Sequence, residues 1–156
     1  MYMILTYLVL LVIVFLGLFI GLLIGYLCEE ELKPGMKYFN LLRHLLFIII
    51  LAVFFVKNPS LLFILLIALL IIAFSFSRHR ETLYYYALAV IFFLSWRYNG
   101  LVMLAPLIFL YSFPLGSIYL YNHIKENKKQ VILGMFYKYA GFLINGIALG
   151  LLGLLF

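Results

Sequence analysis

The side chains that could bind a metal ion are few, and they stand beside cations. The three histidines are His44, His79 and His123, and the single cysteine is Cys28. Histidine, cysteine and carboxylate side chains are the usual ligands of zinc and related metals. Each histidine, however, lies within two residues of a lysine or arginine, and no HExxH or Cys–His spacing occurs. Because nearby positive charge opposes a divalent cation, we predict no metal site and no cofactor.

The acidic residues give no support to catalytic chemistry either. All five are glutamates, none of them lies within an apolar run, and the chain contains no aspartate. This composition excludes aspartyl proteases and aspartate-rich magnesium sites. The sequence places no histidine or other base in a pattern that would activate Cys28 as a nucleophile. We therefore predict no catalytic residue and no enzymatic activity, with Glu29, Glu30 and Glu31 in a solvated loop over 29–37.

Polar side chains that could form a site inside the long apolar runs include Tyr111, Ser112, Lys138 and Asn145. A carboxamide buried in hydrocarbon needs a hydrogen-bond partner. Partners at a comparable depth are the hydroxyls of Tyr111 and Ser112 and the carbonyl freed by Pro114, which has no N–H to donate. We predict that the two helices carrying these residues pack through this set. The alternative is a polar path through the membrane, as in a small transporter or channel.

Glycines recur at helical spacing in the first and last apolar runs. Small residues at this spacing let a second backbone approach closely and make van der Waals contacts that lipid cannot match. The glycines assigned to helix packing or to an interface are Gly17, Gly21, Gly25, Gly134, Gly141, Gly146 and Gly150. They predict contact surfaces, either with helices of the same chain or with another chain in a homo- or hetero-oligomer.

The elements that carry these residues are expected to be membrane-spanning helices. Of the 156 residues, 69% are hydrophobic and 10% are charged, whereas soluble domains have about 45–50% and about 25%. A spanning helix needs about 20 residues, and lipid offers no hydrogen bonds to an open backbone. We predict an all-α integral membrane bundle of six transmembrane helices with short loops and no soluble domain, forming one transmembrane domain over 1–156. The predicted spans are about 2–28, 38–56, 60–77, 82–98, 101–121 and 131–156.

The 11 lysines and arginines predict an orientation for this bundle. The first, third and fifth loops carry seven cations, and the opposite loops carry only Lys57 and Arg97. Because positive residues concentrate in cytoplasmic loops, both termini are expected on the extracytoplasmic side. Cations at the cytoplasmic boundary can also bind anionic lipid headgroups, at about 1 kcal/mol each. The residues assigned to this role are Arg43, His44, Arg78, His79, Arg80, Lys125, Lys128 and Lys129. The net charge of +6 is thereby attributed to topology and lipids, and no nucleic-acid partner is predicted.

The ten residues from Glu30 to Phe39, EELKPGMKYF, directly follow the first glycine-bearing run. This stretch resembles a segment of small uncharacterised polytopic membrane proteins of small-genome archaea, and the resemblance covers about the first 40 residues of the chain. It implies a prokaryotic cell membrane, and it implies no activity because none is known for that group. A composition rich in Leu, Ile, Phe and Tyr is also typical of AT-rich organelle genomes, so an organelle inner membrane is the alternative.

These features lead to three hypotheses about function. The first is a non-enzymatic structural or accessory subunit that assembles through its glycine-lined helix faces. The second is a small transporter or channel with a polar path near Asn145. The third is a protein that binds or handles anionic lipids through the cations of its cytoplasmic side.

Overall fold

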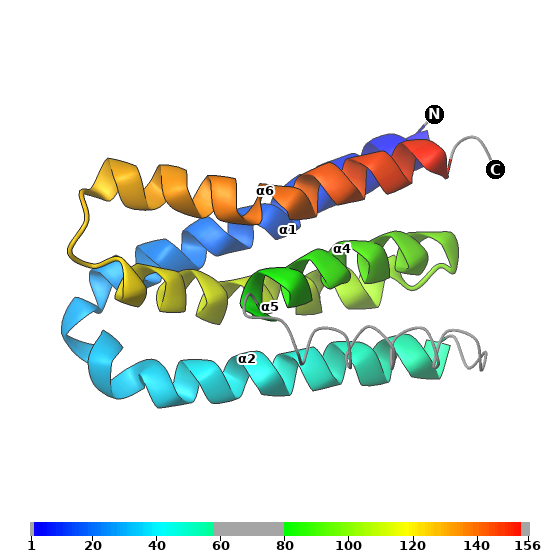
Figure 1. Cartoon of the computed structure of the whole chain (residues 1–156). Coiled ribbons are helices and arrows are strands. Elements are labelled where there is room, and N and C mark those ends of the chain that lie inside the picture. The colour runs from blue at the N-terminus through cyan, green and yellow to red at the C-terminus, as the bar shows by residue number, and fades with distance from the viewer. Residues whose placement is uncertain (1, 58–79, 154–156) are drawn as a thin grey trace.

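The computed structural model describes residues 2–57 and 80–153 of the chain (Figure 1). These residues form helices joined by short connections, and they contain no strand, so the prediction of an all-helical fold is confirmed for this part of the chain. The helices are α1 (Tyr2–Leu27), α2 (Glu29–Lys57), α4 (Arg80–Arg97), α5 (Leu101–Asn122) and α6 (Lys128–Leu152). The predicted span over 60–77 lies outside the described residues.

Four of the described helices, α1, α2, α5 and α6, are long and apolar enough to cross a membrane. Their lengths run from 22 to 29 residues, about 33–44 Å at 1.5 Å per residue, against a hydrocarbon core of about 30 Å. Helix α4 has 18 residues, and charged residues occupy both of its ends. It is about 27 Å long and does not belong to this set of four.

Helix α5 forms the centre of the bundle. It packs along α1 on one side and α2 on another, while α6 packs on α4 and, less extensively, on α1. Figure 1 shows these helices lying roughly along one direction, with the start of α1 beside the end of α6. Helix α5 continues through Pro106 and Pro114 and is buried over most of its length. It is therefore the element against which the other described helices are placed.

Aromatic rings fill the space between α4, α5 and α6. The Tyr85 ring stacks on Phe142 with centroids 4.5 Å apart and lies parallel to Tyr111 at 6.4 Å. Phe92 meets Phe142 edge-on at 6.4 Å. All four side chains are fully or almost fully buried. Edge-on and offset contacts of this kind contribute about 0.5–1.5 kcal/mol each beyond the burial of their area, so this cluster is a main source of packing energy in the bundle.

The connection between α4 and α5 is a tight turn, as the Asn99–Gly100 pair predicts. Asn99 has a φ of 57°, in the left-handed region that asparagine tolerates better than most residues. The N–H of Gly100 then donates to the carbonyl of Ser95 at 2.7 Å. The turn reverses the chain within three residues and sets α5 antiparallel to α4 (Figure 1).

Helix α2 begins at Glu29, nine residues before the predicted start at 38. The expected loop over 29–37 is therefore wrong, and Pro34 lies inside the helix. Glu29, Glu30 and Glu31 occupy the first turn of α2, where negative charge is stabilised by the helix dipole. Figure 1 shows that the first turns of α2 cross the end of the bundle before the helix runs along it. Proline is a usual cause of such a bend, because it removes one hydrogen bond and crowds the preceding turn.

Most of the described cations lie at one end of the bundle. The connection between α1 and α2 and the connection between α5 and α6 are at this end (Figure 1), since Tyr26–Glu31 and Ile124 line one hollow. The lysines at or near these two connections are Lys33, Lys37, Lys125, Lys128 and Lys129. Lys57 and Arg97 end α2 and α4 at the opposite end.

Candidate functional site

The glycines of α1 lie against the backbone of α5. A methyl group added at Gly17 would come within 2.8 Å of the Phe109 carbonyl oxygen, and one at Gly21 would overlap the backbone of Phe113. Ser117 donates its hydroxyl hydrogen to the carbonyl of Gly21 at 2.8 Å. The two helices are thus in direct backbone contact, and Gly17 and Gly21 allow it. Helix packing within the chain occupies this face of α1.

Helix α5 contributes a glycine of its own to this contact. A methyl group at Gly116 would overlap the carbonyl of Leu18. Gly116 and Ser117 are not among the site residues predicted from the sequence. The signal that could have found Gly116 is its spacing of four from Ser112, which places two small residues on one helix face. Both residues are buried in the structure.

The glycines of α6 lie against large side chains of the other helices. A methyl group would come within 2.6 Å of the Tyr119 hydroxyl at Gly134, of Leu11 at Gly146 and of the Tyr7 ring at Gly150. At Gly141 it would overlap the ring of Tyr86. These glycines make room for side chains of α1, α4 and α5, so one chain already fills the space beside them.

Two tyrosine hydroxyls anchor α6 through its backbone. Tyr7 donates to the carbonyl of Gly146 and Tyr86 donates to the carbonyl of Lys138, each at 2.8 Å. Hydrogen bonds between helices contribute about 0.6 kcal/mol on average and up to about 1.7 kcal/mol in membrane proteins, because the unfolded chain in the membrane also finds partners. They fix the rotation of α6 about its own axis relative to α1 and α4.

The buried hydroxyls of Ser112 and Tyr85 are also used within the chain. Ser112 donates to the carbonyl of Ile108 at 3.0 Å and lies 3.3 Å from the hydroxyl of Tyr85. Tyr111 is buried, with a relative exposure of 1%. This arrangement is a contact between helices α4 and α5. Neither of the two cavities described below is lined by Tyr111 or Ser112.

Asn145 lies apart from Tyr111 and Ser112, because its side chain is exposed on the outer face of α6. Helices α5 and α6 make only a small contact. The prediction that these two helices pack through Asn145 and the hydroxyls of α5 is therefore wrong. Within the described ranges 2–57 and 80–153, the Asn145 amide makes no hydrogen bond. The structure consequently does not join Asn145, Tyr111 and Ser112 into one polar path.

Lys138 is partly buried and lies against aromatic rings. Its ammonium group is 5.2 Å from the centroid of the Tyr119 ring and 5.6 Å from that of Tyr139. A second lysine, Lys128, lies 5.4 Å from the ring centroid of Tyr26. Cation–π contacts contribute about 0.5–1 kcal/mol at exposed sites and more where water is excluded. The rings therefore hold two positive charges in fixed places toward the lysine-rich end of the bundle.

The other cations assigned to lipid headgroups are only partly described. Arg78 and His79 lie outside the described residues, and so does the side chain of Arg80. Lys125, Lys128 and Lys129 are exposed. His44 donates from Nδ1 to the carbonyl of Asn40 at 2.6 Å, and His123 donates to the carbonyl of Tyr119 at 2.8 Å. Both histidines thus use one ring nitrogen within their own helix.

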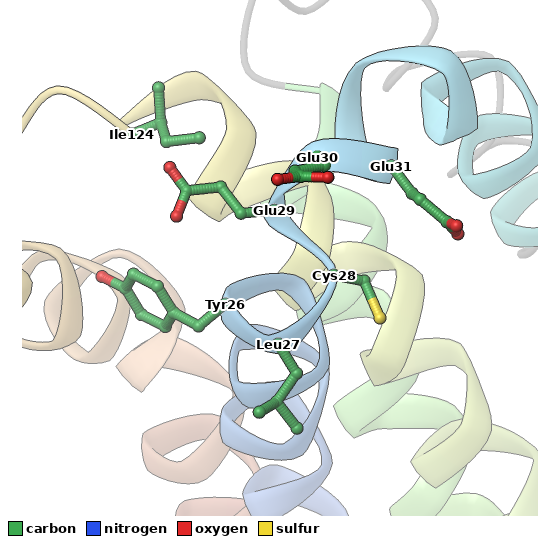
Figure 2. Close-up of a pocket in the computed structure, with 7 residues that line it drawn as sticks. All are labelled: Tyr26, Leu27, Cys28, Glu29, Glu30, Glu31 and Ile124. Carbon is green, nitrogen blue, oxygen red and sulfur yellow. The ribbon is translucent and has the colours of Figure 1, made fainter.

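A hollow of about 760 Å³ lies at the corner between α1 and α2 (Figure 2). The residues that line it are Tyr26, Leu27, Cys28, Glu29, Glu30, Glu31 and Ile124. Figure 2 shows the carboxylates of Glu29 and Glu30 near Ile124, while the side chains of Cys28 and Glu31 point away from them. The described residues contain no group of three His, Cys, Asp or Glu side chains placed to hold a metal ion. The hollow is an acidic, open surface feature.

A second cavity, of about 390 Å³, opens between α1 and the first half of α5. Its lining is entirely apolar and includes Ile13, Val102 and Pro106. In a membrane this groove faces hydrocarbon, and Asn145 lines neither it nor the acidic hollow.

The comparisons with known proteins give no relative for this chain: no protein-family model matches it, and no similar curated protein or solved structure was found.

Proposed function

We propose that the chain is a non-enzymatic integral membrane protein that serves as a structural or accessory subunit of a membrane assembly. The observation that supports this proposal is the exposed carboxamide of Asn145 in the apolar part of α6. The buried hydroxyls of Tyr7, Ser112 and Ser117 make hydrogen bonds within the chain. The Asn145 amide instead faces outward. A polar group that faces hydrocarbon without a partner is costly, so a neighbouring protein is the expected source of its hydrogen bonds.

The proposal includes the full six-span architecture. The spans of this architecture are about 2–28, 38–56, 60–77, 82–98, 101–121 and 131–156, with both termini outside the cytoplasm of a prokaryotic, archaeal-type cell. The lengths of α1, α2, α5 and α6 support it, as does the gathering of lysines at the end where α1 meets α2 and α5 meets α6. Helix α4 is short for a span, and Arg97 at its end can extend toward the headgroups.

The proposed assembly surface is the outer face of α6, and it is not one of the glycine faces expected from the sequence. Gly17 and Gly21 contact the backbone of α5, and Gly141 contacts the ring of Tyr86, so none of them is free to receive another chain. Among residues 2–57 and 80–153, none covers the outer face of α6 around Asn145, which is exposed. Ile144, which directly precedes Asn145, is 64% exposed, and Tyr137, two turns earlier, is 75% exposed.

Isolation of the tagged chain from its native membrane tests this proposal. Crosslinking in the membrane, followed by native mass spectrometry in mild detergent, should show the chain in a complex of fixed stoichiometry. Asn145→Leu should lower the yield of that complex, because it removes the hydrogen-bonding group and keeps the apolar bulk. Val102→Leu is the matched control, since Val102 is 86% exposed on α5. A strictly monomeric chain without a partner would refute the proposal.

Binding of anionic lipid is the second candidate function. It is favoured by Lys128 and Lys138, which aromatic rings hold in fixed places toward the lysine-rich end of the bundle. A fixed cation near the membrane surface attracts a lipid phosphate by about 1 kcal/mol. Replacing Lys128 and Lys129 with glutamine should release anionic lipid that copurifies with the wild type, whereas Lys57→Gln at the opposite end should not. Equal lipid retention in both variants would exclude this function.

A further inference from the structure

The hydroxyl of Tyr119 belongs to a buried side chain, since Tyr119 has a relative exposure of 4%. Within residues 2–57 and 80–153 this hydroxyl has no hydrogen-bond partner, whereas Tyr7 and Tyr86 each donate to a carbonyl of α6. Its oxygen lies against Gly134, where an added methyl group would come within 2.6 Å of it. A buried hydroxyl without a partner costs free energy, so an acceptor from outside the chain is the expected partner.

The ammonium group of Lys138 reaches the same place. Gly134 and Lys138 are four residues apart and lie on one face of α6, and long side chains of a helix lean toward its N-terminus. The ammonium nitrogen is 5.2 Å from the centroid of the Tyr119 ring. The Tyr119 hydroxyl lies one ring radius and one C–O bond from that centroid, so two oxygens of one tetrahedral anion can reach both groups. Gly134 and Lys138 are each partly exposed, which leaves access from the surface.

The positive charge of Lys138 is not paired with a carboxylate in the part of the chain that the structure describes. Its ammonium group lies against the rings of Tyr119 and Tyr139, which attract a cation through their faces but carry no net charge. Lys138 lies seven residues beyond Val131, where the apolar part of α6 begins, a distance of about 10 Å along the helix. A cation so close to hydrocarbon is stabilised by an anion.

The chemistry of these two groups selects the ligand. An ammonium group only donates hydrogen bonds, and a tyrosine hydroxyl can donate one. Phosphate oxygens accept such bonds, and hydrogen bonds to a charged acceptor are about twice as strong as those between neutral groups. In the orientation proposed above, the Lys138 ammonium group lies toward the cytoplasmic end of α6, where anionic lipids place their phosphates.

We propose that Tyr119 and Lys138 form a site for one phosphate group, held by the Lys138 ammonium group and by a hydrogen bond from the Tyr119 hydroxyl. The phosphate is that of an anionic lipid headgroup or a free phosphate ion, which share this chemistry. The inference rests on the second candidate function above, since it names the residues that hold the headgroup. The Tyr119 ring is fixed by His123, which stacks on it with centroids 4.1 Å apart, and by Tyr139, which meets it edge-on at 6.0 Å.

Binding of a fluorescent phosphatidylglycerol to the purified full chain in neutral micelles tests the role of the hydroxyl. Tyr119→Phe should weaken binding about tenfold, the effect of one hydrogen bond to a charged acceptor. Phenylalanine keeps the ring and its contacts, and unchanged helicity and unfolding check the fold. Tyr137→Phe is the matched control, since Tyr137 is 75% exposed on α6, and it should bind as the wild type does. Equal affinity of Tyr119→Phe and the wild type would overturn the site.

The same assay tests the charge. Lys138→Met should weaken binding about fivefold, the effect of one cation near the membrane surface, and Lys138→Arg should retain it. Glu126, in the connection between α5 and α6, places a negative charge that acts on Tyr119, so Glu126→Gln should strengthen binding. Unchanged affinity for Lys138→Met would contradict the proposed role of the ammonium group.

Two further arms identify the source of the phosphate and separate this site from lipid binding in general. Inorganic phosphate that displaces the labelled lipid from the wild type, and that binds without lipid, identifies the free ion as a ligand, whereas lipid binding that it does not displace identifies the headgroup. If replacing Lys128 and Lys129 with glutamine releases lipid while Tyr119→Phe and Lys138→Met retain it, this site is wrong and the second candidate function stands. Unchanged retention in all these variants would overturn both.

Discussion

Replacing Gly21 with alanine should lower the free energy of unfolding of the bundle by about 2–4 kcal/mol. The added methyl group would overlap three backbone atoms of Phe113, and backbone cannot move aside as a side-chain end can. Helices α1 and α5 must then separate, and overpacking of this kind costs about 1–3 kcal/mol. The hydrogen bond from Ser117 to the Gly21 carbonyl, 2.8 Å long, would also lengthen, which adds about 0.6–1.7 kcal/mol.

Equilibrium unfolding in mixed micelles, with the helical signal as readout, measures this loss. Gly25→Ala is the matched control on the same face of α1. There the nearest atom is a terminal methyl group of Leu120, 2.8 Å away, which can rotate aside, so the cost should stay below about 1 kcal/mol.

The same variant separates the two interpretations of the glycine face. If Gly21 packs within the chain, Gly21→Ala destabilises the monomer, and Gly25→Ala does so far less. If Gly21→Ala leaves the unfolding free energy unchanged and abolishes association between chains, the face belongs to an interface between chains. That result would refute the reasoning from the α1–α5 contact.

Three further variants probe other contacts of the bundle. Tyr7→Phe should cost about 0.6–1.7 kcal/mol in the same micelle unfolding, because it removes the hydrogen bond to the Gly146 carbonyl; no change would mean that the bond is absent in lipid. Tyr85→Ala should cost about 3–5 kcal/mol by the same measurement, since the ring is fully buried and stacks on Phe142 at 4.5 Å; a cost below about 1 kcal/mol would contradict this packing. Glu30→Gln should speed hydrogen exchange of the first-turn amides of α2 up to about fivefold at low salt, because it removes a charge that the helix dipole favours. High salt should suppress that difference, and unaltered exchange at low salt would argue against a helical start at Glu29.

The helix ends could largely be predicted from the sequence because charges bound the apolar runs. The run predicted over 82–98 forms α4 (Arg80–Arg97), and the run over 101–121 forms α5 (Leu101–Asn122). In both cases charged or turn-forming residues lie at the ends of the helix. The residues between them are apolar, and their exposure to water would be unfavourable. Physical constraints on single segments decide these boundaries, and such constraints are visible in a sequence.

The start of α2 is hard to predict because Pro34 and Gly35, which follow three glutamates, are typical of a turn. Pro34 is the sixth residue of α2, so the helix loses the hydrogen bond that an N–H at this position would donate to the Glu30 carbonyl, and it nevertheless continues. Three glutamates in the first turn favour a helix start at Glu29, because they lie at the positive end of the helix dipole.

The rotation of α6 could not be predicted because two adjacent stripes of the helix fit the same spacing. The spacing places Gly134, Lys138, Gly141, Asn145 and Ala148 on one helix face, and the sequence predicts that this face packs against the bundle. The buried residues of α6 are instead Val131, Met135, Tyr139, Phe142, Gly146 and Gly150, a stripe displaced by one residue and hence by about 100°. The rings of Tyr139 and Phe142 are buried in place of the Asn145 amide. Burying these two large rings in the core stabilises the bundle more than a hydrogen bond from a buried Asn145 would.

Asn145 indicates a function only when two properties are combined, its depth along α6 and the direction of its side chain. On a water-soluble protein an exposed asparagine is ordinary, and in a membrane bundle a buried asparagine with a partner is merely structural. Helix α6 is long and apolar enough to cross a membrane, and a span over this helix would put residue 145 at hydrocarbon depth, while the stripe of Tyr139 and Phe142 turns it outward. Each fact alone is unremarkable, but together they leave an amide that lipid cannot satisfy. A protein neighbour at α6 could supply the hydrogen bonds that lipid cannot, and this is the physical ground for the proposed assembly.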